Sequence, residues 1–572
     1  MRKARACSRA LSLLLALALS FALSAAAFAE TQDELSARID AYIEEHRETT
    51  AGLALAVFDR DGVIYQKNTG FADIENTLPV SGETVFEWGS ATKLLVWVSA
   101  MQLWEQGKLD LNADVRDYLP EGFLNNLRYN EPVTMLHLMN HTAGFQEMVF
   151  DLFTPEGADI PALADALRRH EPMQVYAPGT VTAYSNWGAA LAGYLVERVS
   201  GQRFADYVHT HIFAPLGMEH TAIAPDLSDN PWVQERRASL ACYTTAGRSL
   251  GRCFYHIPLY PAGMATGTPE DFTRFGMALL AEDCPLFEKE GTRAALFSPS
   301  DTYGDGVTAR NLHGFWAIPL GVSTVGHGGN TAGCSSYLLL DLEGGRGVTV
   351  MTNQSGEEVY NVELMPLIFG AYEPSGQEPP KGLYRSARVA LHGPVKLISL
   401  GFSTIESQED EGFWCVSGEQ VQGPYGDMLR VSPAVVALEL GLALLYALGL
   451  LFSLGTLLAW PLGALWWALR KKEKRPADAR RGLRRWAAVL QLALAVTLLA
   501  VIVFLSAYMP SVGVLWLFPL CCLLALAMGA LLLLLWKRRD GQARLWNVLS
   551  GVFLVVTIAN VLYWELWHFW IC

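Results

Sequence analysis

Four long apolar runs late in the chain constrain its fold more than any other feature. The runs are residues 434–469, 486–508, 512–536 and 546–570. Each is long enough to cross, as a helix, the roughly 30 Å of hydrocarbon in a bilayer. The first run is too short for two spans of about 20 residues each plus a turn, so it counts as one span over about 434–458, with Pro461 beyond it. We therefore predict a four-helix transmembrane region over residues 433–572.

The loops between these runs predict the orientation of the helices. Residues 470–485 hold nine Lys or Arg and residues 537–544 hold four, whereas residues 507–513 hold none. Basic loops of membrane proteins face the cytoplasm. Residues before 434 are therefore expected on the extracytoplasmic side of a multi-pass cell-membrane protein.

The N-terminal residues predict the same location. Four Lys or Arg within the first nine positions precede an apolar run that closes on Ala27-Phe28-Ala29. This order is typical of a secretory signal peptide with its cleavage site. We interpret residues 1–29 as a removable signal, with an uncleaved anchor as the alternative.

Charge and cysteine usage exclude several classes of partner. Residues 30–432 carry 26 Lys and Arg against 52 Asp and Glu, and this negative excess disfavours nucleic acid. No Cys and His group has zinc-finger spacing. The sequence implies neither a metal nor an organic cofactor. Cys242 and Cys253 bracket a short polar stretch, and both a bridge and two free thiols remain open for them. The expected partners are the bilayer and a small substrate.

The order of predicted elements favours an α+β fold for residues 30–372. A helical apolar stripe covers residues 31–46, and two strand-like runs meet at Asp61-Gly62, a hairpin signal. Another helix is expected from Pro269, with Thr268 as N-cap and Asp271 as its capping partner. This order differs from repeated βαβ units.

Strand signals continue toward the membrane region. Residues 327–354 read as a strand, a Gly-Gly turn and a strand. Residues 373–432 begin with the linker-like EPSGQEPP and continue with short strand-like runs such as FWCVSG and MLRV. We interpret them as a linker with a small β-rich segment.

A serine and a lysine stand at the expected start of a long helix within residues 86–109, FEWGSATKLLVWVSAMQLWEQGKL. Ser90 and Lys93 share one face if the helix begins near residue 90. A serine needs an adjacent base to act as a nucleophile, and a lysine can serve when burial or a cationic neighbour lowers its pKa. A capping serine beside a surface lysine is the alternative.

Two further clusters follow in order, Tyr184-Ser185-Asn186 and His327-Gly328-Gly329. Together with Ser90-x-x-Lys93 they resemble the motifs of the serine β-lactamase and penicillin-recognising D,D-peptidase superfamily, most closely its class C β-lactamase-like branch. LMNHTAGF (138–145) and YPAGMATGTPEDFTRF (260–275) look like two more stretches of that branch. The resemblance covers about residues 32–370. It implies an antiparallel sheet with flanking helices and a helical subdomain.

The resemblance also implies catalytic roles. Ser90 would be the acylated nucleophile, and Lys93 would take its proton or hold its partner. Tyr184 would act as a phenolate-like base and then as the acid for the leaving group, which requires the charge of Lys93 to depress the phenol pKa.

The remaining matches imply substrate-binding roles. Asn186 would bind Lys93 and the substrate amide. The backbone N–H groups of Ser90 and Asn330 would form the oxyanion hole. Gly328 and Gly329 would leave a strand edge bare for the substrate backbone.

The third motif departs from the family pattern, because His327 stands where a lysine is common. An unperturbed imidazole pKa of about 6.5 leaves it mostly neutral at about pH 7.5. The grip on a substrate carboxylate is thereby weakened. This disfavours efficient β-lactam hydrolysis and strict carboxypeptidase action and favours amide, aminopeptidase-like or ester substrates, which the family's His-x-Gly members suggest.

Other motifs give competing interpretations of the site. Ser228-Asp229-Asn230 matches the second motif of the class A branch, although it lies in a Pro-flanked polar stretch. His137 and His141 have the i, i+4 spacing of zinc ligands, but the Glu of a zinc protease does not follow His137. Glu439, within the first span, could mark a polar path or simply face water.

Two functions remain open. The first is a membrane-tethered, extracytoplasmic serine hydrolase that cleaves amide, peptide or ester bonds through an acyl-enzyme, with D-amino-acid-containing or cell-wall-type substrates implied by the resemblance. The second is a catalytically weak receptor or sensor that binds a β-lactam or peptide and is coupled to the membrane helices. The proton-transfer residues favour the first, whereas four spans exceed what an anchor requires.

Overall fold

The protein is described by a computed structural model. It describes residues 32–148, 152–373, 382–393, 396, 403–405, 415–469, 480–506, 516–537 and 544–568. The predicted signal peptide lies outside these residues, as do most of the two basic loops and one end of each of the last three predicted spans.

A nine-stranded antiparallel sheet forms the centre of residues 32–373, which are called the body below. In spatial order its strands are β11 (Asp301–Thr302), β12 (Ala309–Leu312), β13 (Phe315–Pro319), β14 (Ser323–Asn330), β15 (Ser335–Asp341), β16 (Arg346–Thr352), β1 (Gly52–Asp59), β2 (Val63–Asp73) and β3 (Leu78–Pro79). The pairing of β1 with β16 places Leu53 opposite Thr352. The antiparallel sheet with flanking helices is the arrangement that the resemblance implies.

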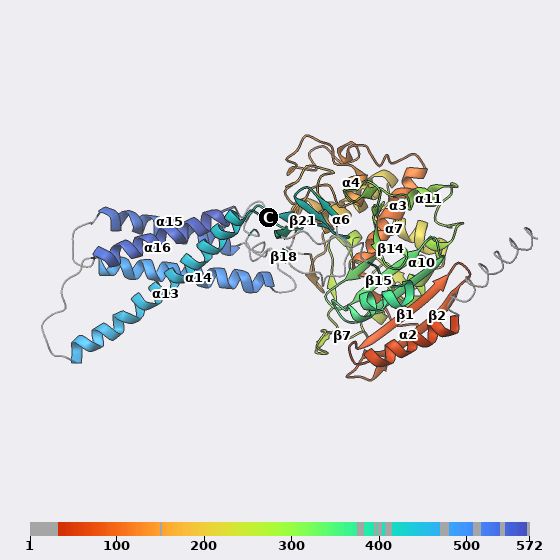
Figure 1. The fold of residues 1–572 in the computed structure, drawn as a ribbon, viewed down its shortest axis with the longest axis horizontal. Coiled ribbons are helices and arrows are strands. Elements are labelled where there is room, and N and C mark those ends of the chain that lie inside the picture. Colours follow the sequence, from red (N-terminus) through yellow and green to blue (C-terminus); the bar gives the residue numbers. More distant parts are fainter. Residues whose placement is uncertain are drawn as a thin grey trace, which may run out of the picture.

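Helices cover both faces of this sheet (Figure 1). On one face, Leu35, Ile39 and Ile43 of α2 (Gln32–His46) pack in a cluster with alternate side chains of β1. On the other face, Ala54 and Phe58 of β1 belong to the larger core with α10 (Pro269–Leu280). Successive side chains of a strand point to opposite faces, which explains why β1 is apolar along nearly its whole length.

The remaining elements of the body are short, apart from two long helices. The helices are α3 (Lys93–Glu105), α4 (Met135–Met139), α5 (Leu163–Arg169), α6 (Asn186–Ser200), α7 (Phe204–Val208), α8 (Ala214–Leu216), α9 (Pro231–Arg237), α11 (Thr292–Leu296) and α12 (Met365–Phe369). Short helical turns are η1 (Gly89–Thr92), η2 (Val115–Asp117), η3 (His209–Phe213), η4 (Tyr260–Ala262) and η5 (Val359–Glu363). The small strands are β4 (Phe86–Glu87), β5 (Thr154–Pro155), β6 (Thr221–Ala222), β7 (Cys242–Tyr243), β8 (Ser249–Gly251), β9 (Tyr255–His256) and β10 (Thr266–Gly267).

Helix α10 begins where the sequence predicts, but only half of the predicted capping box forms. Thr268 accepts a hydrogen bond from the Asp271 N–H. The Asp271 carboxylate does not bond back to Thr268; it accepts from the His220 N–H and the Thr221 hydroxyl, both at 2.8 Å. The side chain therefore holds β6 against the helix start.

The third motif does not open a strand, contrary to the prediction. His327 lies inside β14, which begins at Ser323, and a turn at Thr331–Cys334 separates β14 from β15. The strand was missed because its residues, STVGHGGN, include three glycines and one large apolar side chain. The predicted Gly-Gly turn does connect β15 to β16.

A second, five-stranded sheet lies between the body and the apolar helices (Figure 1). Its strands, in spatial order, are β18 (Ser403–Ile405), β17 (Gly382–Ser386), β21 (Asp427–Arg430), β20 (Gln420–Gln422) and β19 (Cys415–Ser417). The runs FWCVSG and MLRV correspond to β19 and β21.

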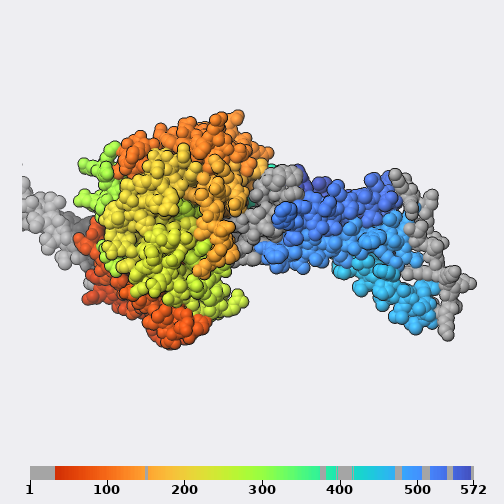
Figure 2. Space-filling model, turned by 180° about the vertical axis from the view of Figure 1, so that it is seen from behind, coloured from red at the N-terminus to blue at the C-terminus, as the bar shows by residue number. Residues whose placement is uncertain are grey.

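Among the residues that the structure describes, four helices are long and apolar enough to span a membrane, as the sequence predicts. They are α13 (Pro433–Leu469), α14 (Arg481–Ser506), α15 (Leu517–Lys537) and α16 (Arg544–Tyr563). The first is a single helix of 37 residues that continues through Pro461, beyond the predicted end near residue 458. Seen from behind, the helices form an elongated mass beside the rounded body (Figure 2).

The described cysteines are free thiols, including Cys242 and Cys253. The buried Cys242 accepts a hydrogen bond from Arg237 at 3.6 Å. The alternative that the sequence left open is thus resolved in favour of free thiols.

Candidate active site

Ser90 and Lys93 lie at the start of a buried helix. Ser90 is in the turn η1, which leads directly into α3 at Lys93, so the helical run begins with a tighter turn than predicted. The Lys93 side chain is fully buried, and its Nζ lies 2.9 Å from Ser90 Oγ. The alternative of a surface lysine is therefore wrong.

Lys93 has two further partners, from different parts of the chain. Its Nζ donates to Asn186 Oδ1 at 2.8 Å and to the Ala262 carbonyl at 2.5 Å. Asn186 is the first residue of α6, and Ala262 ends η4. Both partners are oxygen acceptors without a proton to give, so each requires an N–H from Lys93.

The surroundings of Lys93 favour its neutral form. Burial lowers the pKa of Lys93 well below its usual value, and the positive charge of Arg388 lowers it further. A neutral amine has two N–H groups and one lone pair. In the structure Nζ donates to Ser90 Oγ. Once the amine is neutral and Asn186 and Ala262 use its two N–H groups, its lone pair is left to accept the Ser90 proton. The contact has the geometry of a nucleophile and its general base.

Tyr184 stands above Lys93, just before α6. Ser185 caps this helix by accepting from the Gly188 N–H. The Tyr184 ring stacks on His141, with centroids 4.4 Å apart, and Lys93 Nζ lies 5.0 Å from the ring centroid. Its buried hydroxyl has no hydrogen bond of ordinary geometry with the described residues.

The pKa of Tyr184 moves opposite to the expectation. Burial raises the phenol pKa above its usual value, and the nearby Ser90 hydroxyl and Arg388 charge offset only part of this rise. Lys93 is not among the groups that lower it, contrary to the expectation. In the free site Tyr184 is therefore a neutral proton donor.

His327 is buried on β14 and is neutral. Its side chain Nδ1 contacts the Gly328 carbonyl at 2.5 Å, and its Nε2 has no partner among the described residues. Burial lowers the pKa of His327 to about 3, with a further contribution from Lys93. The third motif thus supplies no cation at neutral pH, as expected.

The end of β14 lies directly against the Ser90 turn. A Cβ added at Gly329 would lie 1.9 Å from the Trp88 carbonyl oxygen and 2.9 Å from the Ser90 nitrogen. Gly89 has φ +53°, and a Cβ there would lie 2.6 Å from the Asn330 nitrogen. Only glycine permits this approach, which brings together the two backbone segments of the expected oxyanion hole. The Asn330 side chain turns away to accept from Ser335 and Gly356.

A cleft of about 720 Å³ opens above these residues. Seven of the eight predicted site residues line it, namely Ser90, Tyr184, Asn186, His327, Gly328, Gly329 and Asn330. Lys93 lies beneath it. Its far wall includes Arg388, Tyr425 and Asp427, which the sequence analysis missed because their segment carries no recognised motif.

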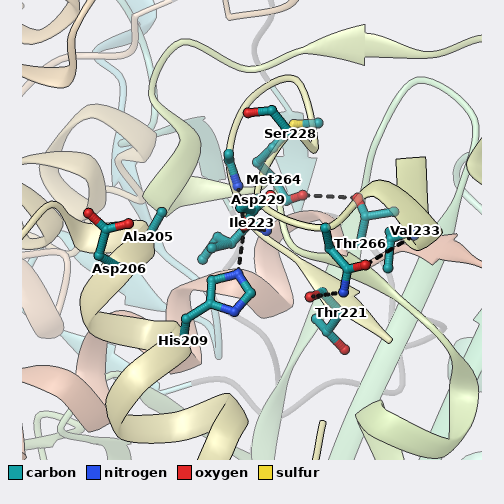
Figure 3. A network of polar contacts seen from close by, with 12 residues as sticks. Ala205, Asp206, His209, Thr221, Ile223, Ser228, Asp229, Val233, Met264 and Thr266 are labelled. Carbon is teal, nitrogen blue, oxygen red and sulfur yellow. Dashed lines mark hydrogen bonds and ion pairs between the residues drawn. The ribbon is translucent and has the colours of Figure 1, made fainter. Parts of the chain in front are cut away.

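The second serine motif does not line the cleft. Figure 3 shows its Asp229 beside His209. Asp229 Oδ2 lies 2.8 Å from His209 Nε2 and accepts from the Ile223 N–H at 2.8 Å. Asn230 caps α9 by accepting from the Val233 N–H. Ser228 and its neighbours are therefore structural.

The two histidines with zinc-like spacing are also structural. His137 and Thr134 form a reciprocal capping box at the start of α4. His141 Nδ1 accepts from the Ser185 N–H at 3.1 Å, which fixes the start of α6. Within the described ranges, no group of His, Cys, Asp and Glu could hold a metal.

Comparisons with known proteins agree with this geometry. Residues 39–373 match the protein family described as Beta-lactamase. The chain is 35% identical over 173 residues to a beta-lactamase of Yersinia enterocolitica, covering 30% of this chain and 42% of that protein. It is 34% identical over 203 residues to esterase EstB of Burkholderia gladioli, covering 32% and 50%. The chain spans about half the length of the curated relatives it matches.

A solved structure shares the fold. The crystal structure of SurE with D-Leu has a TM-score of 0.50 at 20% sequence identity, covering 70% of this chain and 99% of that one. At this identity the likeness concerns the fold alone.

Proposed function

Since the chain belongs to the beta-lactamase family, we propose that it is a serine hydrolase that cleaves amide or ester bonds through an acyl-enzyme on Ser90. The observation that carries this proposal is the 2.9 Å contact between Ser90 Oγ and the buried Lys93 Nζ beneath the cleft. A site that only binds has no need for a serine beside a lysine of lowered pKa.

Acylation begins with attack by Ser90. Its Oγ forms a bond to the substrate carbonyl carbon while its proton passes to the lone pair of Lys93 Nζ. The negative charge moves to the carbonyl oxygen, which the N–H groups of Ser90 and Asn330 stabilise. Asn186 and Ala262 hold the ammonium that forms, because both accept from it.

Tyr184 completes the proton balance. When the bond to the leaving group breaks, the neutral phenol of Tyr184 donates its proton to the departing nitrogen or oxygen. The proton held by Lys93 then restores the phenol. Water attacks the acyl-enzyme in the second half of the cycle and gives its proton to Lys93. The bond between the acyl carbon and Ser90 Oγ then breaks, and Lys93 returns this proton to Oγ.

The substrate backbone binds along a free stretch of β14. Strand β13 pairs with β14 only from Ser323 to Gly326, whereas β15 pairs with it up to Asn330. Residues 327–330 thus have no described strand on the side that faces the cleft. An extended peptide added to such an edge gains main-chain hydrogen bonds. This geometry supports peptide-like substrates, and the family motifs support D-amino-acid-containing or cell-wall-type ones.

We place this activity outside the cytoplasm, on a multi-pass membrane protein. The N-terminal signal over residues 1–29 and the basic loops at residues 470–485 and 537–544 support this orientation. The four apolar helices support membrane insertion.

A receptor or sensor is the second candidate function. The observation that favours it is the wall of the cleft formed by Arg388, whose segment also contacts the apolar helices. In this function the cleft binds a peptide or β-lactam with little turnover.

The test uses the full chain in detergent micelles. Hydrolysis of a small activated ester and of a D-alanine amide is measured for the wild type, Ser90→Ala and Ser228→Ala. Loss of activity in Ser90→Ala alone is the expected result. Equal rates in wild type and Ser90→Ala would contradict the hydrolase and favour the receptor; Ser228→Ala controls for the loss of a serine elsewhere in the body.

A further inference from the structure

We propose that Arg388 is the cation that binds a substrate carboxylate in this cleft, and that the apolar helices hold it in position. The proposal rests on the proposed function, since it concerns the substrate of the same site. Arg388 lies beyond residues 39–373, which match the family, so the assignment does not follow from the motifs.

Arg388 is the one Lys or Arg among the described residues that line the cleft. Lys93 is buried below and bonded to Ser90, Asn186 and Ala262. His327 is neutral because burial lowers its pKa to about 3. A substrate carboxylate therefore has a single cationic partner available in this part of the cleft.

The guanidinium of Arg388 retains donors for a ligand. Its Nε forms an ion pair with Glu147, and its terminal nitrogens bond no other residue within the described ranges. Arginine has five N–H donors in a fork that matches a carboxylate. The side chain is 44% exposed, so a ligand can reach these donors.

The position of Arg388 indicates where the carboxylate lies. Its guanidinium carbon is 4.9 Å from the centroid of the Tyr184 ring. Tyr184 is the proposed acid for the leaving group. Arg388 therefore binds a carboxylate on the leaving-group side of the scissile bond, as in a peptide that ends in a free carboxylate.

Two of the three acidic residues that line the same cleft are already engaged, whereas Glu358 is exposed. Asp427 pairs with Arg310 at 2.7 Å, and both side chains are 1% exposed. Glu357 accepts from the Tyr360 N–H and from the Asn361 side chain. These contacts reduce the repulsion that a bound carboxylate meets.

The backbone that follows Arg388 is tied to the body. The Glu147 N–H donates to the Val389 carbonyl at 3.2 Å. Gln146 Oε1 accepts from the N–H groups of Leu391 and His392, both at 3.1 Å. These contacts fix the segment that places Arg388 in the lining of the cleft.

Two carboxylates from the region of the apolar helices bind the same segment. Glu439 of α13 is 2% exposed and pairs with Arg385 at 2.7 Å, three residues before Arg388. Glu565, which follows α16, accepts from the Gly393 N–H at 2.9 Å, five residues after it. Glu439 also accepts from Tyr563, so the contact joins α13 and α16. Glu439 therefore neither lines a polar path nor faces water.

The first experiment compares two thioesters in the full chain in detergent. N-acetyl-D-alanyl thioglycolate has a carboxylate on its leaving group, and N-acetyl-D-alanyl thioglycolamide is its neutral counterpart. Arg388→Gln is expected to lower kcat/KM for the carboxylate about tenfold relative to the amide, the size of one charge-assisted contact. Arg388→Lys should recover part of this loss. Arg236→Gln, which removes an exposed arginine from another ion pair, should leave the ratio unchanged.

Equal losses for both thioesters in Arg388→Gln would overturn the proposal, because a purely structural role does not distinguish the two leaving groups. A second measurement separates this outcome from failure of the hydrolase itself. In the Ser90→Ala background, Arg388→Gln should weaken binding of N-acetyl-D-alanyl-D-alanine about tenfold and leave its C-terminal amide unaffected. This binding test decides the role of Arg388 even if no turnover occurs.

The role of the helices is tested by Glu439→Gln and Glu565→Gln. Neither residue touches the cleft, yet both variants should shift the carboxylate-to-amide ratio in the same direction as Arg388→Gln. Glu83→Gln, which breaks an exposed ion pair with Arg236, is the control. An unchanged ratio in both bundle variants would refute the anchoring.

Discussion

At the residue scale, Lys93 is the central residue of the proposed mechanism, since it contacts Ser90, Asn186 and Ala262. Its ammonium form would have to lose water completely, which costs several kcal/mol for a buried ion. The structure compensates with two oxygen acceptors rather than a carboxylate partner. Lys93 is thereby held in place and kept ready to accept a proton from Ser90.

The pH profile should reveal the lowered pKa of Lys93. The active form has Lys93 neutral and Tyr184 protonated, and burial lowers the first pKa and raises the second. The value of kcat/KM should rise with pH through the lowered lysine pKa and become level below the usual lysine value of about 10.4. Lys93→Met should lose roughly 10²–10⁴-fold in activity. A rate that still rises tenfold per pH unit up to the usual lysine pKa would contradict the neutral base.

His327 should contribute no step to this profile. Because burial lowers its pKa to about 3, the imidazole stays neutral in folded protein from pH 5 to 8. The pH profiles of wild type and His327→Asn should therefore have the same shape over this range, whatever their absolute rates. A step near pH 6.5 that disappears in His327→Asn would show that the imidazole titrates.

At the scale of elements, the site depends on how closely β14 approaches the turn η1. The contact leaves no space for a side chain at Gly329. This is a property of two segments more than 200 residues apart in the sequence, and it fixes the separation of the backbone N–H groups at the proposed oxyanion hole.

Gly329→Ala should therefore impair activity and folding together. Its Cβ would overlap the Trp88 carbonyl, 1.9 Å away, so β14 must move from the turn. We expect kcat/KM to fall at least about 100-fold, the loss caused by removing one oxyanion donor, and Tm to decrease. Gly82→Ala, where a Cβ would meet nothing within 4 Å, should change neither quantity. Normal activity in Gly329→Ala would mean that the strand adapts freely.

Several elements could be predicted from local sequence, and others could not. The helix at residues 32–46 and the strands about Asp61-Gly62 follow from apolar periodicity and turn residues. The start of strand β14 could not be predicted, because its glycines allow a close approach to η1 and do not favour a strand. The predicted hydrogen bond from the Asp271 carboxylate back to the helix start does not form, because the carboxylate binds Thr221 of β6 instead.

The site could also be predicted only where local sequence motifs exist. Ser90, Lys93, Tyr184 and Asn186 belong to short motifs, and the structure brings them together beneath one cleft. The pKa of Tyr184 could not be derived from its neighbours in sequence, because burial outweighs charge. Arg388 lines the cleft only because the second sheet packs against the body. No local sequence pattern predicts this packing.

At the scale of the whole molecule, a buried ion pair fastens this second sheet to the body. Arg310 of β12 and Asp427 of β21 lie 2.7 Å apart and are each 1% exposed. Asp427 also accepts from the Thr182 N–H at 2.8 Å. Because Thr182 lies two residues before Tyr184, this contact joins the sheet to the catalytic segment.

Asp427→Ala should separate the second sheet from the body or destabilise both of them. Removing one partner of a buried pair costs about 3–5 kcal/mol, since the other charge stays buried. The Tm of the full chain in detergent should decrease clearly, and the carboxylate preference assigned to Arg388 should weaken. Asp40→Ala breaks an exposed pair with Lys67, which is worth about 1 kcal/mol or less. Similar Tm values in the two variants would argue against the fastening role.

The position of Glu565 has a consequence for biogenesis. This residue follows α16, yet it holds the segment that presents Arg388. During synthesis the serine, lysine and tyrosine emerge long before the last membrane helix. On the proposed role of Arg388, the nascent protein carries its reactive groups first and acquires its substrate selectivity only after α16 is inserted. Selectivity would thus mark the completion of membrane assembly.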